Sequence, residues 1–173
     1  MSGVLEKDNA IGLNDAFAAA MRAMASTVSV ITAADRAGER YGMTATSVTS
    51  VSMAPASLLV CINRTNASFD AVRETGRFCV NLLSDAQSQQ CFTFATPGPK
   101  TDCFETETWD AVDGLPCLRD AAAVIVCRVA REIHHGSHGI FIGDVEHVSV
   151  GRDPVQPLVY LNREIVPVRP ACG

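Results

Sequence analysis

Short runs of apolar and β-branched residues recur along this chain between turn-forming residues, while segments with helical spacing are few. The runs that predict strands are 27–34, 41–52, 57–62, 77–83, 140–150 and 158–161. Helices are predicted at 14–25, 67–75 and 85–94. Many short strands with three short helices predict a mainly β fold, an antiparallel barrel with a few short peripheral helices.

The first helix has the clearest apolar face. Asn14 or Asp15 can cap its start, and the pattern continues to about residue 25. Its apolar side chains recur at positions i, i+4 and i+7, namely Phe17, Met21 and Met24. This spacing places them on one side of the helix, so we expect a single apolar stripe.

Residues 121–132 fit two interpretations. A run of alanines favours a helix, whereas the apolar residues from Val124 to Val129 favour a strand. Apolar residues occupy both parities of this run, as in a strand buried on both faces, and we therefore predict a strand. A tight turn at 136–139 would join it to 140–150 as a long hairpin, with Gly143 as a candidate bulge.

The segment 41–52 is the most distinctive, because six serine and threonine residues lie within it. Its polar positions are all small hydroxyls, and we predict one strand that leads into a loop. Such a surface offers N–H and O–H donors without charge, and it lets a flat or phosphorylated ligand approach the backbone. The alternative is an ordinary edge strand rich in threonine and serine.

Length and composition indicate a single domain over 1–173, with an ordered core of about 14–170. Of the 173 residues, 47% are hydrophobic and 19% are charged, which supplies a core and argues against disorder. The net charge of -5 offers no basic surface for nucleic acid. No apolar run reaches membrane-spanning length and the N-terminus lacks the features of a signal peptide, so we expect a cytoplasmic protein without membrane contact.

The cysteines and histidines favour neither a disulfide framework nor a metal site. The seven cysteines are odd in number and none is spaced Cys-x-x-Cys, which fits a reducing compartment. His134 and His138 have the spacing of a helical metal pair, but Gly136 and Gly139 interrupt any helix there. The glycine motif of dinucleotide-binding folds, the P-loop and the Gly-x-Ser-x-Gly of hydrolases are missing from the sequence.

Four motifs follow one another in a characteristic order. They are Gly42-Met43-Thr44-Ala45-Thr46-Ser47, Val60-Cys61-Ile62-Asn63, the following Ser68, and Phe78-Cys79-Val80-Asn81-Leu82. With these motifs the chain resembles the short-chain flavin reductase family over about residues 14–170. It resembles most the reductase components of two-component aromatic monooxygenases, of the 4-hydroxyphenylacetate 3-monooxygenase type, and those of pyrimidine degradation.

The resemblance implies a Greek-key split β-barrel that works as a homodimer and binds FMN or FAD. It implies an NAD(P)H:flavin oxidoreductase, in which NADH or NADPH passes hydride to the flavin and reduced flavin then serves a separate oxygenase component. The cofactors carry the chemistry, while the protein orients the two rings and stabilises the anionic reduced flavin.

The resemblance also assigns residues to the flavin site. Donors beside the ring would come from Thr44, Ala45, Thr46 and Ser47. A second cluster would be Asn63, Arg64, Ser68 and Phe69. There Ser68, at a helix N-terminus, would anchor the phosphate; strand-end and helix capping is the alternative role for Asn63 and Ser68. Further contacts would be Lys100, Phe104, Gly143, Asp144, Tyr160 and Arg163, and His138 would lie at the nicotinamide site.

One position departs from the family pattern. Relatives usually have Asp-[Lys/Arg]-Phe where this chain has Asp102-Cys103-Phe104. The basic side chain that the resemblance would place beside the flavin phosphate is therefore replaced by Cys103. Lys100 or Arg64 would then carry the positive charge.

Two other functions stay open at this point. A flavin-bound reductase could pass electrons to a metal-centred substrate, such as a ferric chelate or the cobalt of a corrin ring, and tight flavin retention would favour it. The second alternative is a non-catalytic module that binds flavin or heme. A failure to oxidise NADH with any acceptor would favour this second alternative.

Overall fold

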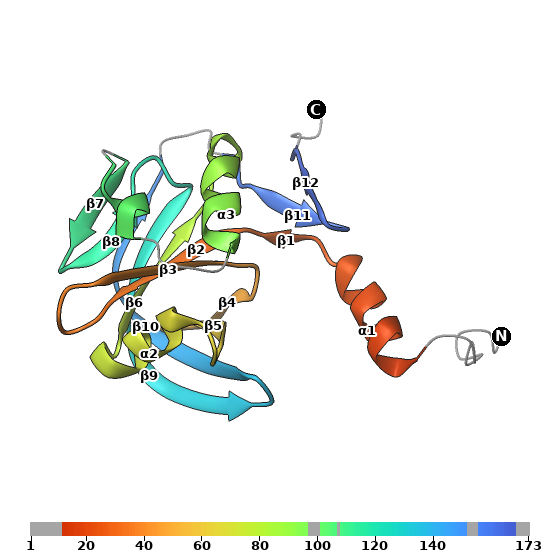
Figure 1. The fold of residues 1–173 in the computed structure, drawn as a ribbon, viewed down its shortest axis with the longest axis horizontal. Helices are drawn as coiled ribbons and strands as arrows, with labels where there is room; N and C mark the ends of the chain where they lie inside the picture. The colour runs from red at the N-terminus through yellow and green to blue at the C-terminus, as the bar shows by residue number, and fades with distance from the viewer. Residues whose placement is uncertain (1–11, 97–100, 107, 152–155, 169–173) are drawn as a thin grey trace.

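The computed structural model describes residues 12–96, 101–106, 108–151 and 156–168. Its body is a seven-stranded antiparallel sheet in the order β3-β2-β6-β9-β10-β5-β4 (Figure 1). The strands are β2 (Ser29–Ala34), β3 (Arg40–Ala45), β4 (Val48–Met53), β5 (Ala56–Asn63), β6 (Arg77–Leu82), β9 (Ala123–His135) and β10 (His138–Val150). The predicted mainly β architecture is confirmed, and neighbours such as β5 and β10 are far apart in the chain, as Greek-key connections require.

The two edge strands of this sheet, β3 and β4, are consecutive in the chain. Only Thr46 and Ser47 join them, so the sheet curls until its edges meet and forms a barrel that is split between β3 and β4. We call Thr46 and Ser47 the seam. The prediction of one strand over 41–52 is therefore wrong, because the chain crosses from one edge of the sheet to the other at the seam.

In the described part of the chain, three α-helices accompany the barrel. They are α1 (Leu13–Arg22), α2 (Ala67–Thr75) and α3 (Ser88–Ala95), with two short 3-10 turns, η1 (Asp85–Gln87) and η2 (Thr101–Phe104). The α2 helix starts at Asn66, whose side chain accepts a hydrogen bond from the Ser68 N–H, and ends at Gly76 in the left-handed conformation with φ of 69°. Among the described residues, no helix combines the length and apolarity needed to cross a membrane.

The α1 helix projects away from the barrel (Figure 1). Gly12, in extended conformation, takes the N-cap position, so the cap expected from Asn14 or Asp15 is wrong. Asp15 lies instead in the first turn, where a carboxylate favours the positive end of the helix dipole. None of the residues of α1 is buried, and its apolar stripe, which includes Phe17 and Met21, faces solvent.

The described residues also form two small sheets beside the barrel. One consists of β1 (Ser26–Thr27), β11 (Val159–Leu161) and β12 (Glu164–Val166), and the other of β7 (Trp109–Val112) and β8 (Leu115–Leu118). The β12 strand was not predicted. A backbone hydrogen bond of 2.9 Å from the Asn162 N–H to the Arg22 carbonyl ties the β11–β12 turn to the end of α1.

A buried polar network fastens β8 to the barrel. Asn81 of β6 accepts a hydrogen bond from the Leu118 N–H at 2.7 Å and donates to the Val30 carbonyl at 3.0 Å and to Thr32 Oγ1 at 3.1 Å. Thr32 in turn donates to the Pro116 carbonyl at 2.6 Å. Since Asn81 and Thr32 are fully buried, this network fixes β8 in one position.

The central strands β9 and β10 form the long hairpin that the sequence predicted. The strand predicted at 121–132 is confirmed, and a register shift between Ile142 and Gly143 confirms the bulge. Three glycines of the sheet are in close contact with rings, because a Cβ on each would lie closer than 3.0 Å to a ring carbon. The pairs are Gly42 with Phe94, Gly139 with Phe69 and Gly143 with Phe78. Core packing therefore requires these glycines.

Candidate functional site

The start of β10 brings three predicted site residues to one end of the sheet. His138 lies opposite Asn63 of β5. Arg64 donates from its backbone N–H to the Ser137 carbonyl at 2.9 Å and from Nη2 to the Gly136 carbonyl at 2.8 Å. The Ser137 hydroxyl lies 2.9 Å from Nδ1 of His138. We call Asn63, Arg64 and His138 the polar end.

The seam residues lie near the same end of the sheet. Thr46 and Ser47 are exposed, and the Ser47 hydroxyl donates to the Cys61 carbonyl at 3.1 Å. The Cys61 N–H donates back to the Ser47 carbonyl at 3.3 Å. Because Cys61 and Asn63 are two residues apart on β5, their side chains share a face of the sheet. The seam and the polar end therefore border the same surface.

That surface is apolar and lies outside the core. Alternate residues of β5 enter the core, whereas Leu59 and Cys61 point the other way and stay half-buried. Opposite them on β10 lie Ile142 and Ile140, which are also half-buried. We call Leu59, Cys61, Ile140 and Ile142 the outer apolar face. A flat apolar surface bordered by hydroxyls, amides and one guanidinium fits a planar ring with a phosphate tail.

The residues around α2 already have structural partners. Asn63 Oδ1 accepts hydrogen bonds from the N–H and the hydroxyl of Thr65, both at 3.0 Å. This contact is the strand-end capping that was the alternative role for Asn63. The N–H of Ser68 donates to Asn66 Oδ1 at 2.9 Å, and Ser68 is buried. Phe69 is also buried, within the barrel core rather than on the outer apolar face.

Three further predicted residues meet where β3 contacts α3 and η2. The Thr44 hydroxyl donates to the Cys91 carbonyl of α3 at 2.7 Å, and Ala45 is buried in the core. Phe104 is buried, with its ring centroid 5.0 Å from that of Trp109. In this arrangement Thr44 and Phe104 hold α3 and η2 against the barrel.

Arg40 is a charged residue at this junction that the sequence analysis missed. Its guanidinium lies 5.6 Å from the ring centroid of Phe104, Nη1 donates to the Phe104 carbonyl at 3.3 Å, and Nη2 pairs with Glu105. It places a guanidinium, paired with Glu105, against the η2 turn that contains Cys103. A signal was available in its spacing, because Arg40 lies two residues before Gly42 on β3 and therefore on the same face of that strand. Lys100 lies outside the described residues.

The last predicted residues fall into two places. Gly143 faces the core against Phe78, and Asp144 is half-buried opposite Arg128 of β9. Tyr160 of β11 and Arg163 of the β11–β12 turn belong to the small sheet near α1. In a single chain the structure therefore brings together Thr46, Ser47, Asn63, Arg64 and His138. In the part of the chain that the structure describes, no group of three His, Cys, Asp or Glu residues could hold a metal ion.

Comparisons with known proteins agree with this geometry. A family model described as Flavin reductase like domain matches residues 21–169, which confirms the family resemblance. The FMN reductase (NADH) RutF of Pseudomonas syringae pv. syringae (strain B728a) is 38% identical over 152 residues, covering 86% of this chain and 83% of that protein. The reductase component of the FADH(2)-dependent resorcinol hydroxylase of Rhizobium sp. (strain MTP-10005) is 35% identical over 162 residues, covering 92% of this chain and 90% of that protein.

Two further comparisons concern length and fold. A probable flavin reductase of Rhizobium meliloti (strain 1021) is 40% identical over 134 residues, which cover 77% of this chain but only 41% of that longer protein. The solved structure of the flavin reductase PheA2 in its native state superposes with a TM-score of 0.81 at 28% identity, covering 92% of this chain and 100% of that one. The split-barrel fold is thus shared with solved flavin reductases.

Proposed function

Because the chain belongs to the flavin reductase like family, we propose that it is an NAD(P)H-dependent oxidoreductase that supplies reduced FMN or FAD to a separate oxygenase component. The observation that carries the proposal is the outer apolar face, bordered by the hydroxyls of the seam and by the polar end. The relatives support it, since one is named for reducing FMN with NADH and another as the reductase component of a hydroxylase.

Each part of the site has a physical role in this proposal. The outer apolar face would receive the flat ring system and bury apolar surface. The Thr46 hydroxyl would donate to the polar edge of the ring, where negative charge develops on reduction, and the Ser47 hydroxyl would do the same by exchanging the Cys61 carbonyl for the ring. Arg64 would pair with the phosphate, and His138 would position the nicotinamide. A bound flavin supplies the hydride-accepting chemistry itself.

We extend the proposal to a homodimer, because the single chain leaves apolar surface uncovered. Leu13 is 84% exposed, Phe17 62% and Met24 58%, all on or beside α1, and the outer apolar face is only half-buried. A ten-residue helix of which no residue is buried among the described part of the chain is marginal in water, so a partner that covers its stripe would stabilise it. A second copy supplies one, and α1 would carry the attached β11–β12 turn, with Tyr160 and Arg163, toward the partner.

The visible spectrum of the purified protein, before and after anaerobic addition of NADH, tests the activity. Oxidised flavin absorption that bleaches with NADH is the expected result. No flavin binding, even with added FMN or FAD, would refute the proposal. Flavin that stays with the protein through desalting would favour the alternative in which electrons pass to a metal-centred substrate.

Variants of the seam test the site itself. The double variant Thr46→Val, Ser47→Val should raise the Kd for FMN by about tenfold or more, because two hydroxyl donors are lost. Thr27→Val is a matched control, since this exposed threonine lies on β1, in another sheet. Circular dichroism should show an intact fold in both variants. An unchanged FMN affinity in the double variant would remove the seam from the site.

A further inference from the structure

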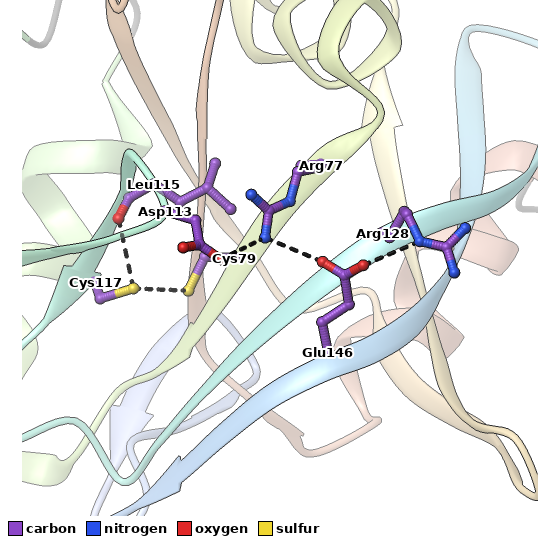
Figure 2. Close-up of polar contacts among 7 residues, drawn as sticks. All are labelled: Arg77, Cys79, Asp113, Leu115, Cys117, Arg128 and Glu146. Atoms are coloured by element: carbon purple, nitrogen blue, oxygen red, sulfur yellow. Dashed lines mark hydrogen bonds and ion pairs between the residues drawn. The ribbon is translucent and has the colours of Figure 1, made fainter.

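Two cysteine side chains from different parts of the chain are in contact beside the barrel core. The sulfur atoms of Cys79 on β6 and Cys117 on β8 lie 3.7 Å apart. Figure 2 shows the two side chains pointing toward each other. Both residues are buried, Cys79 fully and Cys117 with 4% exposed. Cys117 belongs to the small β7–β8 sheet and Cys79 to the barrel, so a disulfide between them would join the two, with the sulfur atoms drawing together to about 2.05 Å.

The two sulfur atoms differ in their access to solvent. Cys117 is among the residues that line a half-open hollow of about 700 Å³, between the β7–β8 hairpin and the ends of β9 and β10. Asp110, Arg119 and His147 line the same hollow beside apolar residues such as Val112 and Val124, so part of its wall is polar and can take up a small polar molecule. Cys79 does not line it and lies deeper in the core. A small oxidant would therefore reach Cys117 first.

The two thiols also differ in acidity, and this difference too favours Cys117 as the reactive thiol. The hydrogen bond to Cys117 together with burial raises the pKa of Cys79 well above its usual value. The same hydrogen bond lowers the pKa of Cys117 because it stabilises the thiolate. The thiolate is the reactive form of cysteine, so Cys117, the thiol with the lowered pKa, is the nucleophile of the pair.

We propose that Cys79 and Cys117 form a peroxide-responsive dithiol that closes to a disulfide between β6 and β8. In the first step the Cys117 thiolate attacks one oxygen of hydrogen peroxide; the O–O bond breaks, one proton is taken up, and sulfenic acid and water are formed. In the second step the Cys79 sulfur attacks the Cys117 sulfur, the S–O bond breaks, and the thiol proton leaves with hydroxide as water. Two thiols are oxidised by two electrons and one peroxide is reduced to two waters.

The proposed function supplies a source of this oxidant. Reduced flavin released into air reacts with dioxygen, which takes up two electrons and two protons to give oxidised flavin and hydrogen peroxide. That source rests on the proposed reductase activity, whereas the dithiol itself does not. The test therefore uses added hydrogen peroxide and no NADH, so that a failure of the dithiol is separate from a failure of the reductase.

The experiment counts thiols in the full-length chain. The reduced protein is treated with hydrogen peroxide, unfolded, alkylated and weighed by mass spectrometry. Untreated protein should carry seven alkyl groups, one for each cysteine, and treated protein should carry five, with a mass loss of two hydrogens from the unalkylated pair. Seven alkyl groups after treatment would overturn the proposal.

Peptide mapping then identifies the partners. Trypsin releases residues 78–100 and 101–119, which carry Cys79 and Cys117 together with Cys91 and Cys103. Fragmentation of the linked peptides should place the bond between Cys79 and Cys117. A bond that involves Cys91 or Cys103 instead would overturn the proposal.

Variants separate the two roles. Cys79→Ala should lose the disulfide and accumulate a sulfenic acid at Cys117 that dimedone traps, whereas Cys117→Ala should show neither product. Cys91→Ala is the matched control, a buried cysteine outside the pair, and should still lose two thiols. Trapping of sulfenic acid at Cys79 rather than Cys117 would contradict the assigned order of attack.

Discussion

Replacing Gly143 by alanine should destabilise the barrel and leave flavin affinity little changed. A Cβ at this position would lie 2.6 Å from Cζ of Phe78 and 2.8 Å from Cβ of Cys127. Carbon atoms in contact prefer about 3.5–4.0 Å, so both neighbours must retreat by about 1 Å. Phe78 is fully buried and the Cβ of Cys127 is attached to the backbone of β9, so neither has free space. The backbone at Gly143 does not have positive φ, and the cost is therefore one of packing alone.

The expected magnitude follows from these contacts. Overpacking a core typically costs about 1–3 kcal/mol, and two rigid neighbours place this site in the upper half of that range. Alanine lowers the conformational entropy of the unfolded chain relative to glycine, which offsets about 0.4–1 kcal/mol of the packing cost. We expect the free energy of unfolding to fall by about 2 kcal/mol, which is about 4–8 °C in Tm for a chain of this length. Urea and thermal unfolding, followed by the fluorescence of Trp109, measure it.

A double-mutant cycle identifies the cause. Phe78→Leu removes ring atoms that the new methyl would meet, so Gly143→Ala should cost about half as much in that background. If Gly143→Ala left stability unchanged and weakened flavin binding instead, the glycine would serve the ligand, as the sequence suggested, and the packing argument would fail.

Three further predictions concern other parts of the molecule. Asn81→Ala leaves the buried Leu118 N–H without its side-chain acceptor and should lower the free energy of unfolding by about 3 kcal/mol, measured in urea; a loss below about 1 kcal/mol would contradict the network. The hydrogen bond from Arg119 lowers the pKa of Asp110, so this pair stabilises the fold above the ordinary carboxyl pKa and loses that effect as pH falls through the lowered value. In Arg119→Met, NMR titration should find the Asp110 pKa higher than in the parent chain, and an unchanged value would be inconsistent with this pairing. Phe17→Asp should shift sedimentation from dimer to monomer, and a parent chain that is already monomeric would refute the role of α1.

The sequence predicted those elements whose pattern favours one arrangement over its alternatives. Residues 121–132 carry apolar side chains on both parities, and in β9 Val126 enters one core cluster while Cys127 enters the other. A helix would have placed such residues around its whole circumference, so the strand was the better solution. The site was predicted in part for the same reason, because residues at the ends of neighbouring strands, such as Asn63 and His138, meet wherever those strands pair.

What the sequence could not show is which segments become neighbours. Small hydroxyl residues fit either face of a strand, so the local sequence does not mark the seam. On one side of the seam Thr44 pairs with Val30, and on the other side Thr49 pairs with Leu59 at the opposite edge of the sheet. The role of Gly143 could not be read either. A missing side chain shows that something is close, and only the fold identifies it as Phe78.

The central hairpin determines the order in which the barrel can assemble. The β9 and β10 strands pair at twelve register positions across a two-residue turn, so their contacts form with the closure of a short loop. Contacts between segments close in sequence form fastest, and we expect pulse-labelled hydrogen exchange to protect this hairpin first, with β5 and β6 added on its two sides. The edges β3 and β4 then close last, at the seam. A ligand bound there would hold the finished barrel shut and slow its opening, so the cofactor would act as the final element of the fold.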